Sequence, residues 1–152
     1  MHKFRGISSL SLDAKGRVVL PARYRERLAE ICNSELIVTI DPDHPCLLIY
    51  PLPDWEVIEQ QIEALPSFNP TTRKIQRLLI GHASEVEIDG TGRLLLSPML
   101  RDHARLGKKV VLVGQGKKFE LWDESVWSGS VADWSNESIS ADRPAALEEL
   151  SL

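Results

Sequence analysis

The chain has 152 residues, of which 43% are hydrophobic and 26% charged, and its formal net charge is -4. These values exclude a fibrous or wholly disordered protein and suffice for one core or two small, related ones. No apolar run approaches the roughly 20 residues of a membrane-spanning helix, and the first residues lack the apolar stretch of a secretion signal. We therefore expect a cytoplasmic protein, in which Cys32 and Cys46 are inert, buried thiols.

The charge is unevenly distributed along the chain. Residues 1–27 carry seven Lys or Arg against two acidic residues, whereas residues 120–152 carry eight acidic residues against one arginine. Solvation alone accounts for the acidic end. The basic N-terminal part has the distribution expected of an electrostatic footprint for nucleic acid.

The first 32 residues predict a strand, a tight turn, a second short strand and a helix. Leu10 and Leu12 alternate with serines as in a half-buried strand, and an aliphatic run at 18–20 comes after the Asp-x-x-Gly turn, so we expect a hairpin. Pro21 can open the helix, which runs to about Glu30.

A pair of apolar strands, 36–40 and 46–50, comes next and is followed by a helix over 54–65 that Pro66 stops. A connector helix is then capped by Asn69 and closed by Gly81. One face of the connector helix is basic, and a solvated surface is favoured there over DNA contact. That face carries Arg73, Lys74 and Arg77.

The remaining chain repeats this pattern. At an offset of 76, residues 10–20 align with 86–96 with Asp, Gly and Arg identical, and Arg25 aligns with Arg101. Pro98 comes one position late because Ser97 is inserted, and its helix is expected to end at Gly107 with a left-handed cap. A second strand pair, 110–113 with 119–122, comes next. At an offset of 72, two aromatic matches continue the repeat: Tyr50 with Trp122 and Trp55 with Trp127.

These patterns divide the chain into four parts. They are a first repeat with its closing helix at 1–65, a helical connector at 66–81, a second repeat at 82–134 and an acidic, Ser-rich tail at 135–152, whose last residues can form a short helix.

The repeated Asp-x-x-Gly-Arg turn has a clear chemical use. The aspartate can accept backbone N–H groups across the turn and the glycine can adopt a positive φ, so the turn becomes stiff and orients the arginine after it. A guanidinium just beyond such a turn can grip a phosphate or read guanine O6 and N7 together. We expect the tips to be oriented by Asp13, Gly16, Asp89 and Gly92, and DNA to be contacted by Arg17, Arg93 and Lys15. In the second copy Thr91 stands at the position of Lys15.

A turn-stabilising salt bridge between Asp13 and Arg17 is the simpler interpretation of one copy alone. The duplication favours use in binding, because folding gives less reason to keep an exposed arginine at the same place in both halves.

Several motifs resemble the MraZ family of bacterial transcriptional regulators, and together they cover residues 4 to about 127. They are Phe4-Arg5-Gly6, Leu12-Asp13-Ala14-Lys15-Gly16-Arg17, Pro21-Ala22-Arg23-Tyr24-Arg25, Asp41 with His44-Pro45-Cys46, Tyr50-Pro51-Leu52-Pro53-Asp54-Trp55-Glu56, Gln76-Arg77-Leu78-Leu79-Ile80-Gly81-His82-Ala83, residues 89–96, and Phe119-Glu120-Leu121-Trp122.

The resemblance implies an α+β fold, mainly β with short helices, in which two AbrB-like swapped-hairpin repeats form an intramolecular pseudo-dimer. It implies homo-oligomeric rings of about eight to twelve subunits, closed by head-to-tail contacts. It also implies a nucleoid-associated regulator of double-stranded DNA, whose target is G-rich direct repeats in the promoter of the division and cell-wall gene cluster that includes its own gene. The family motif assigns DNA contact to Arg17 and Arg93, whereas Thr91 and Ser97 depart from the first copy.

No pattern indicates an enzyme, a metal site or a cofactor. The four histidines have no ligand spacing, and the chain lacks a phosphate loop and a nucleophile elbow. A structural or protein-binding ring that meets acidic partners remains the alternative function. An antitoxin would need a toxin-wrapping tail, which the short acidic end poorly supplies.

Overall fold

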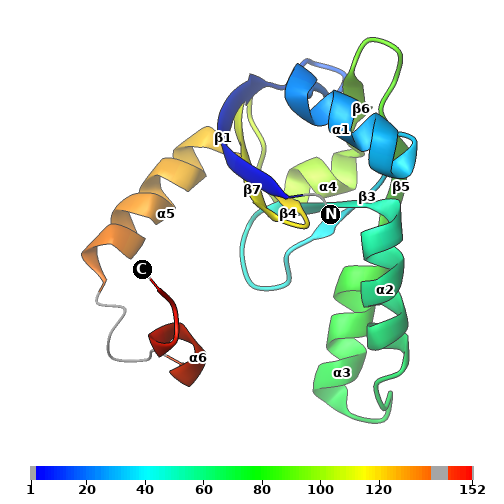
Figure 1. The fold of residues 1–152 in the computed structure, drawn as a ribbon, viewed down its shortest axis with the longest axis vertical. Coiled ribbons are helices and arrows are strands. Elements are labelled where there is room, and N and C mark those ends of the chain that lie inside the picture. The colour runs from blue at the N-terminus through cyan, green and yellow to red at the C-terminus, as the bar shows by residue number, and fades with distance from the viewer. Residues whose placement is uncertain (1–2, 138–143, 152) are drawn as a thin grey trace.

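The computed structural model describes residues 3–137 and 144–151, which form a curved sheet with helices at its edges (Figure 1). The six-stranded sheet has the order β1-β7-β8-β4-β3-β5, and β2 and β6 form a separate two-stranded ribbon. The strands are β1 (Phe4–Ser11), β2 (Arg17–Val19), β3 (Glu35–Ile40), β4 (Leu47–Pro51), β5 (Ser84–Glu87), β6 (Arg93–Leu95), β7 (Lys109–Gly116) and β8 (Phe119–Asp123). The helices are α1 (Ala22–Cys32), α2 (Leu52–Glu63), α3 (Pro70–Ile75), the π-helix η1 (Gln76–Ile80), α4 (Pro98–His103), α5 (Glu124–Asn136) and α6 (Ala145–Glu148).

The two halves of the chain exchange strands. β1 pairs with β7 of the second half along its whole length, and β5 pairs with β3 of the first half. The pairing of β4 with β8 joins the halves at the centre of the sheet. Each half therefore completes the sheet of the other, which confirms the expected α+β fold of two swapped-hairpin repeats in one chain.

The hairpin expected around the first turn exists only at its tip. Leu12 and Val18 form an isolated bridge beside the turn, but β2 otherwise pairs with β6 and not with β1. The extended hairpin prediction was therefore wrong. Alternation of apolar residues identifies a strand without naming its partner, and here Val18 is buried at 1% exposure directly opposite Leu94 at 0%.

One large apolar cluster contains residues of both halves. Phe4, Tyr24 and Phe119 meet at its aromatic part, with the ring centroids of Phe4 and Phe119 4.3 Å apart and those of Tyr24 and Phe119 4.9 Å apart. Because Phe119 belongs to the second half and the other two to the first, neither half encloses this cluster alone.

Two aromatic pairs repeat the same contact in the two halves. The centroids of Tyr50 and Trp55 lie 5.6 Å apart where β4 leads into α2, and those of Trp122 and Trp127 lie 5.5 Å apart where β8 leads into α5. The sequence offset of 72 therefore corresponds to a structural repeat. Cys32 and Cys46 are buried and free, as expected.

Local prediction succeeded at the starts of α1 and α4 and failed at the end of α4. Pro21 is the N-cap of α1, and Pro98 is the first residue of α4, which Ser97 caps by accepting a hydrogen bond from the Leu100 amide at 3.4 Å. The cap expected at Gly107 was wrong. α4 ends at His103, Arg105 takes the positive φ of 53°, and the Gly107 amide instead donates to the Asp123 carboxylate at 2.9 Å.

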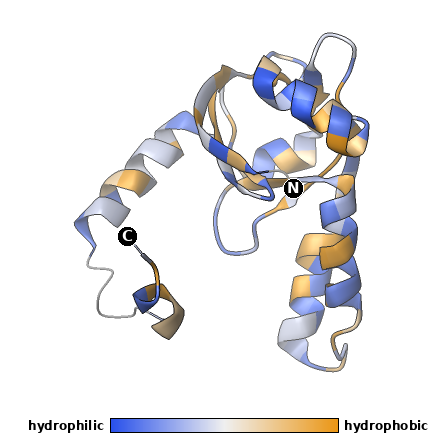
Figure 2. Ribbon diagram, in the orientation of Figure 1, coloured by the Kyte–Doolittle hydropathy of each residue, from blue (hydrophilic) through white to orange (hydrophobic). Residues whose placement is uncertain are grey.

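α2, α3 and η1 form a helical arm that extends away from the sheet, and α5 leaves on the other side (Figure 1). The side chain of Asn69 caps α3 as expected, accepting from the amides of Thr71 and Thr72. Polar and apolar stretches alternate along the arm (Figure 2). At its end Leu65 is 44% and Phe68 86% exposed. None of the helices in the described residues combines the length and the apolar character that a membrane span requires.

Candidate nucleic-acid interface

The first tip, residues 13–17, is organised by one carboxylate. Oδ1 of Asp13 accepts the backbone amides of Lys15 and Arg17, each at 2.9 Å, and Oδ2 accepts Nε of Arg17 at 2.7 Å. The Gly16 amide donates to the carbonyl of Asp13 at 3.0 Å, and Gly16 has a φ of 85°. The expected Asx turn with a left-handed glycine is therefore present.

The second tip, residues 89–93, repeats this arrangement. Oδ1 of Asp89 accepts the amides of Thr91 and Arg93 at 2.9 Å, and Oδ2 accepts Nε of Arg93 at 3.1 Å. Gly92 has a φ of 81°. One bond has no counterpart in the first tip, because the Thr91 hydroxyl also donates to Oδ1 of Asp89 at 2.8 Å.

Both aspartates have a lowered pKa. For each of them the backbone hydrogen bond from the arginine four residues later is the largest cause. The pKa of Asp89 is lowered more strongly than that of Asp13, and the Thr91 hydroxyl is its second cause. Both carboxylates are therefore ionised when they hold their arginines.

The two arginines lie on one ribbon. Arg17 pairs with Leu95 and Arg93 pairs with Val19, on either side of the central pair of Val18 and Leu94. Because side chains alternate along a strand and the central pair is buried, both arginines belong to the opposite, outward face. Diagonal neighbours on such a pair are separated by roughly 7–8 Å.

The arginine side chains remain accessible. Their relative exposures are 29% for Arg17 and 34% for Arg93. Each ion pair with aspartate uses Nε, and among the described residues no hydrogen bond engages the terminal nitrogens of either guanidinium. The salt bridge of the simpler interpretation is thus real, and it fixes the side chain while leaving the two nitrogens that a bidentate contact needs. Lys15 lies exposed on the first tip.

Two further arginines contact the tips, and sequence analysis did not assign them to the site. An atom placed at the Cβ position of Gly16 would lie 2.7 Å from Nε of Arg101, and one placed at Gly92 would clash with Cδ of Arg25. Each tip is therefore packed against an arginine on the first helix of the other half. The offset of 76 between Arg25 and Arg101 was the available signal, but it could not show the exchange.

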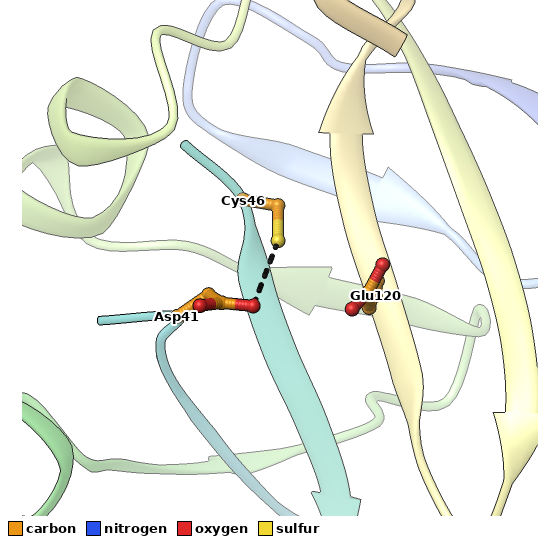
Figure 3. A group of neighbouring side chains, drawn as sticks. All are labelled: Asp41, Cys46 and Glu120. Atoms are coloured by element: carbon orange, nitrogen blue, oxygen red, sulfur yellow. Dashed lines mark hydrogen bonds between the residues drawn. The ribbon is translucent and has the colours of Figure 1, made fainter. Parts of the chain in front are cut away.

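One group of possible metal ligands occurs elsewhere in the described residues: Asp41, Cys46 and Glu120 (Figure 3). The Cys46 thiol donates to Asp41 at 3.7 Å, and burial followed by the nearby carboxylates raises the pKa of Cys46. Glu120 accepts the indole N–H of Trp122 at 2.9 Å. Cys46 and Glu120 thus each form a hydrogen bond within the protein.

The exchange of strands and the paired tips define a duplicated swapped-hairpin protein. The family described as "MraZ protein, putative antitoxin-like" matches the chain twice, over residues 4–78 and 79–149. Relatives named transcriptional regulator MraZ include that of Alkalilimnicola ehrlichii, 52% identical over 149 residues, and that of Coxiella burnetii, 54% identical over 151 residues; each alignment covers 98% of this chain and 99% of the relative.

The chain belongs to the MraZ family. The two matches agree with the internal repeat seen in sequence and structure. Transcriptional regulators are not enzymes, so family membership also confirms the expectation of a non-enzymatic protein.

Proposed function

We propose that this chain is a sequence-specific DNA-binding regulator whose β2–β6 ribbon enters the major groove. The observation that carries the proposal is the placement of Arg17 and Arg93 on one outward ribbon face, each held at Nε by an aspartate. A two-stranded ribbon is one of the shapes that a major groove admits.

In this arrangement the terminal nitrogens of Arg17 and Arg93 read guanine O6 and N7 or grip a phosphate. Asp13, Gly16, Asp89 and Gly92 orient the two tips, and Lys15 adds a phosphate contact at the first tip. Val19 and Leu95, exposed at 48% and 57% on the same ribbon, supply apolar contacts such as those made with a thymine methyl group.

The proposed target rests on family membership and on the chemistry of arginine. G-rich direct repeats offer the guanine edges that arginine reads best, and a promoter of the division and cell-wall gene cluster, including the protein's own operon, is the proposed location. The protein would then be cytoplasmic and associated with the nucleoid.

Assembly into a ring of about eight to twelve subunits would let successive tips engage successive repeats at high effective concentration. The apolar end of the helical arm supports self-association, because Phe68 at 86% exposure and Leu65 at 44% present apolar surface that a neighbouring subunit could cover. Replacing Phe68 by serine is expected to shift the assembly toward smaller species. Native mass spectrometry of Phe68→Ser beside Ser67→Ala measures this, and an unchanged mass would exclude Phe68 from the contact.

The alternative function is a structural or protein-binding ring. Val19 and Leu95 support this alternative, because their exposed apolar surface beside the two ribbon arginines also fits an acidic protein partner.

Footprinting of the purified protein on the region upstream of its own gene, paired with a native mass measurement, tests the proposal. We expect protected, evenly spaced G-rich repeats. The test variant is Arg17→Ala, in which we expect most of the protection to be lost while the oligomer mass is kept. Uniform, weak protection without repeats would contradict sequence-specific binding, and capture of an acidic protein with no protected DNA would favour the alternative.

A further inference from the structure

The basic N-terminal segment contains more cations than the ribbon uses. Four of them line an open surface pocket of about 660 Å³ between the start of β1 and α1. The cavity is lined by Lys3, Arg5, Arg23, Arg27, Tyr24 and Glu30, among others. We call this cavity the α1 pocket.

Two of its arginines are held in position by the fold. Nη2 of Arg23 donates to the hydroxyls of Ser8 and Tyr24, both at 3.1 Å, and its guanidinium lies 4.5 Å from the centroid of the Tyr24 ring. Nη1 of Arg27 donates to the carbonyl of Lys3, with the guanidinium 5.7 Å from the centroid of the Phe4 ring. A ligand would therefore meet guanidinium groups whose side-chain entropy is already partly lost.

The positive charge of the α1 pocket is not neutralised within the described part of the chain. None of its four cations forms an ion pair there, and Glu30 is the one carboxylate of the lining. All four cationic side chains belong to residues exposed to solvent. Like charges gathered around one cavity repel each other, and a bound anion relieves that repulsion.

The second repeat shows that the fold does not need these cations. At the offset of 76, Tyr24 is matched by the equally buried Leu100, so this position of the first helix belongs to the core in both repeats. The four cations, however, are matched by Leu79, Gly81, Met99 and His103. The four cations of the pocket are thus a property of the first repeat alone.

We propose that the α1 pocket is a binding site for a phosphate-bearing anion, separate from the arginines of the ribbon. Guanidinium groups match the geometry of phosphate oxygens in bidentate contacts, and the volume lies in the range of small-ligand sites, roughly 300–1,000 Å³. The phosphate comes from a free phosphorylated ligand or from the backbone of bound DNA, and the experiment separates these two sources.

The site has a direct physical link to the second tip. Arg25 lies on α1 between the two positioned arginines of the pocket and packs against Gly92. A ligand in the α1 pocket therefore contacts a helix that also packs against the second tip.

Tripolyphosphate, titrated calorimetrically into the full-length protein at fixed ionic strength, probes the free-ligand source. The test variant is the double substitution Lys3→Gln with Arg5→Gln, since neither side chain forms a hydrogen bond within the described residues. The control is Lys108→Gln with Lys109→Gln, which removes the same charge at exposed positions near the other end of β1. We expect the test variant to bind about tenfold more weakly and the control to bind like the wild type.

Citrate and duplex DNA complete the test. The DNA backbone is the source of the phosphate if two results are found together. Tripolyphosphate does not saturate the protein, and the test variant, unlike the control, reduces the magnitude of the slope of log K against log salt for DNA by about one or two. Equal binding of citrate and tripolyphosphate, or equal behaviour of test and control variants with both probes, would overturn the proposal. The ribbon variant Arg17→Ala with Arg93→Ala should still bind tripolyphosphate, which separates this site from the proposed regulatory function.

Discussion

The two tips share a scaffold and differ in the two residues between aspartate and glycine, which are Ala14 and Lys15 in the first tip and Gly90 and Thr91 in the second. Both aspartates accept hydrogen bonds from the backbone amide and from Nε of the arginine four positions later. The first tip places the cation of Lys15 at its apex, whereas the second places the Thr91 hydroxyl there and uses it for one more internal bond. The two copies thus hold the arginine in the same way. The first copy adds a cation, and the second adds an internal hydrogen bond.

The tips also rest on different neighbours. Beneath Gly16 lie Nε of Arg101, which donates to the Leu96 carbonyl at 3.1 Å, and that carbonyl itself. Beneath Gly92 lies Arg25, whose buried Nε has no hydrogen-bond partner in the described structure. The first tip therefore abuts a backbone carbonyl as well as an arginine side chain, whereas the nearest atoms at the second tip all belong to the Arg25 side chain.

The greatest change is expected from removing the arginines. Each bidentate contact with guanine is worth about 1–3 kcal/mol, so Arg17→Ala and Arg93→Ala should each weaken specific binding substantially, and the double variant should abolish it. Mobility-shift titrations of rings with verified mass measure this. If only one single variant is affected, the tips do not contribute equally; if neither is, the ribbon is not the DNA-binding surface.

Alanine at the two glycines should distinguish the neighbours of the tips. A left-handed backbone costs a residue with a Cβ roughly 1–2 kcal/mol at either site. Gly16→Ala should cost more than Gly92→Ala, because its Cβ would lie 2.8 Å from the Leu96 carbonyl oxygen, whereas the contacts at Gly92 are with the Arg25 side chain. Urea unfolding midpoints, with the exposed Gly90→Ala as control, check the order. The reverse order would show that Arg25 is the more rigid neighbour.

Exchanging the apex residues tests the division of charge. Lys15→Thr should reduce the magnitude of the slope of log K against log salt by about one for each tip that contacts a phosphate. Thr91→Lys should increase that magnitude by a similar amount. Lys117→Thr provides a control for net charge. Unchanged slopes in both variants would mean that the apices do not reach the phosphates.

The weakest effect concerns acidity. Because the pKa of each aspartate is lowered in the folded tip, its stabilising contribution is present above the ordinary aspartate pKa of about 3.9 and is lost as the pH falls below it. The difference in melting temperature between the wild type and Asp89→Asn should therefore shrink below about pH 4. It should persist to lower pH than the corresponding difference for Asp13→Asn, because the pKa of Asp89 is lowered more. A constant difference across this range would contradict the role of the charged carboxylates.

Much of the site was predictable because its chemistry is local. The hydrogen bonds to Asp13 from residues two and four positions later, and the positive φ of Gly16, depend on a stretch of five residues. The contact of Arg25 with Gly92 was not predictable, because it requires knowing that the helix of one half reaches the tip of the other.

The duplication, the turns and most strands and helices could be read from the amino-acid order alone, since these depend on periodicity and on turn chemistry within a few residues. The pairing of the strands required the folded molecule. The alternating pattern around Val18 is compatible with any apolar partner strand, and burial of the core that both halves share selects Leu94 of the second half. That choice places the two arginines on one ribbon. The same packing brings β1 against α1 and so creates the α1 pocket. Its four cations are separated by up to 24 positions, so the amino-acid order alone could not show that they line one pocket.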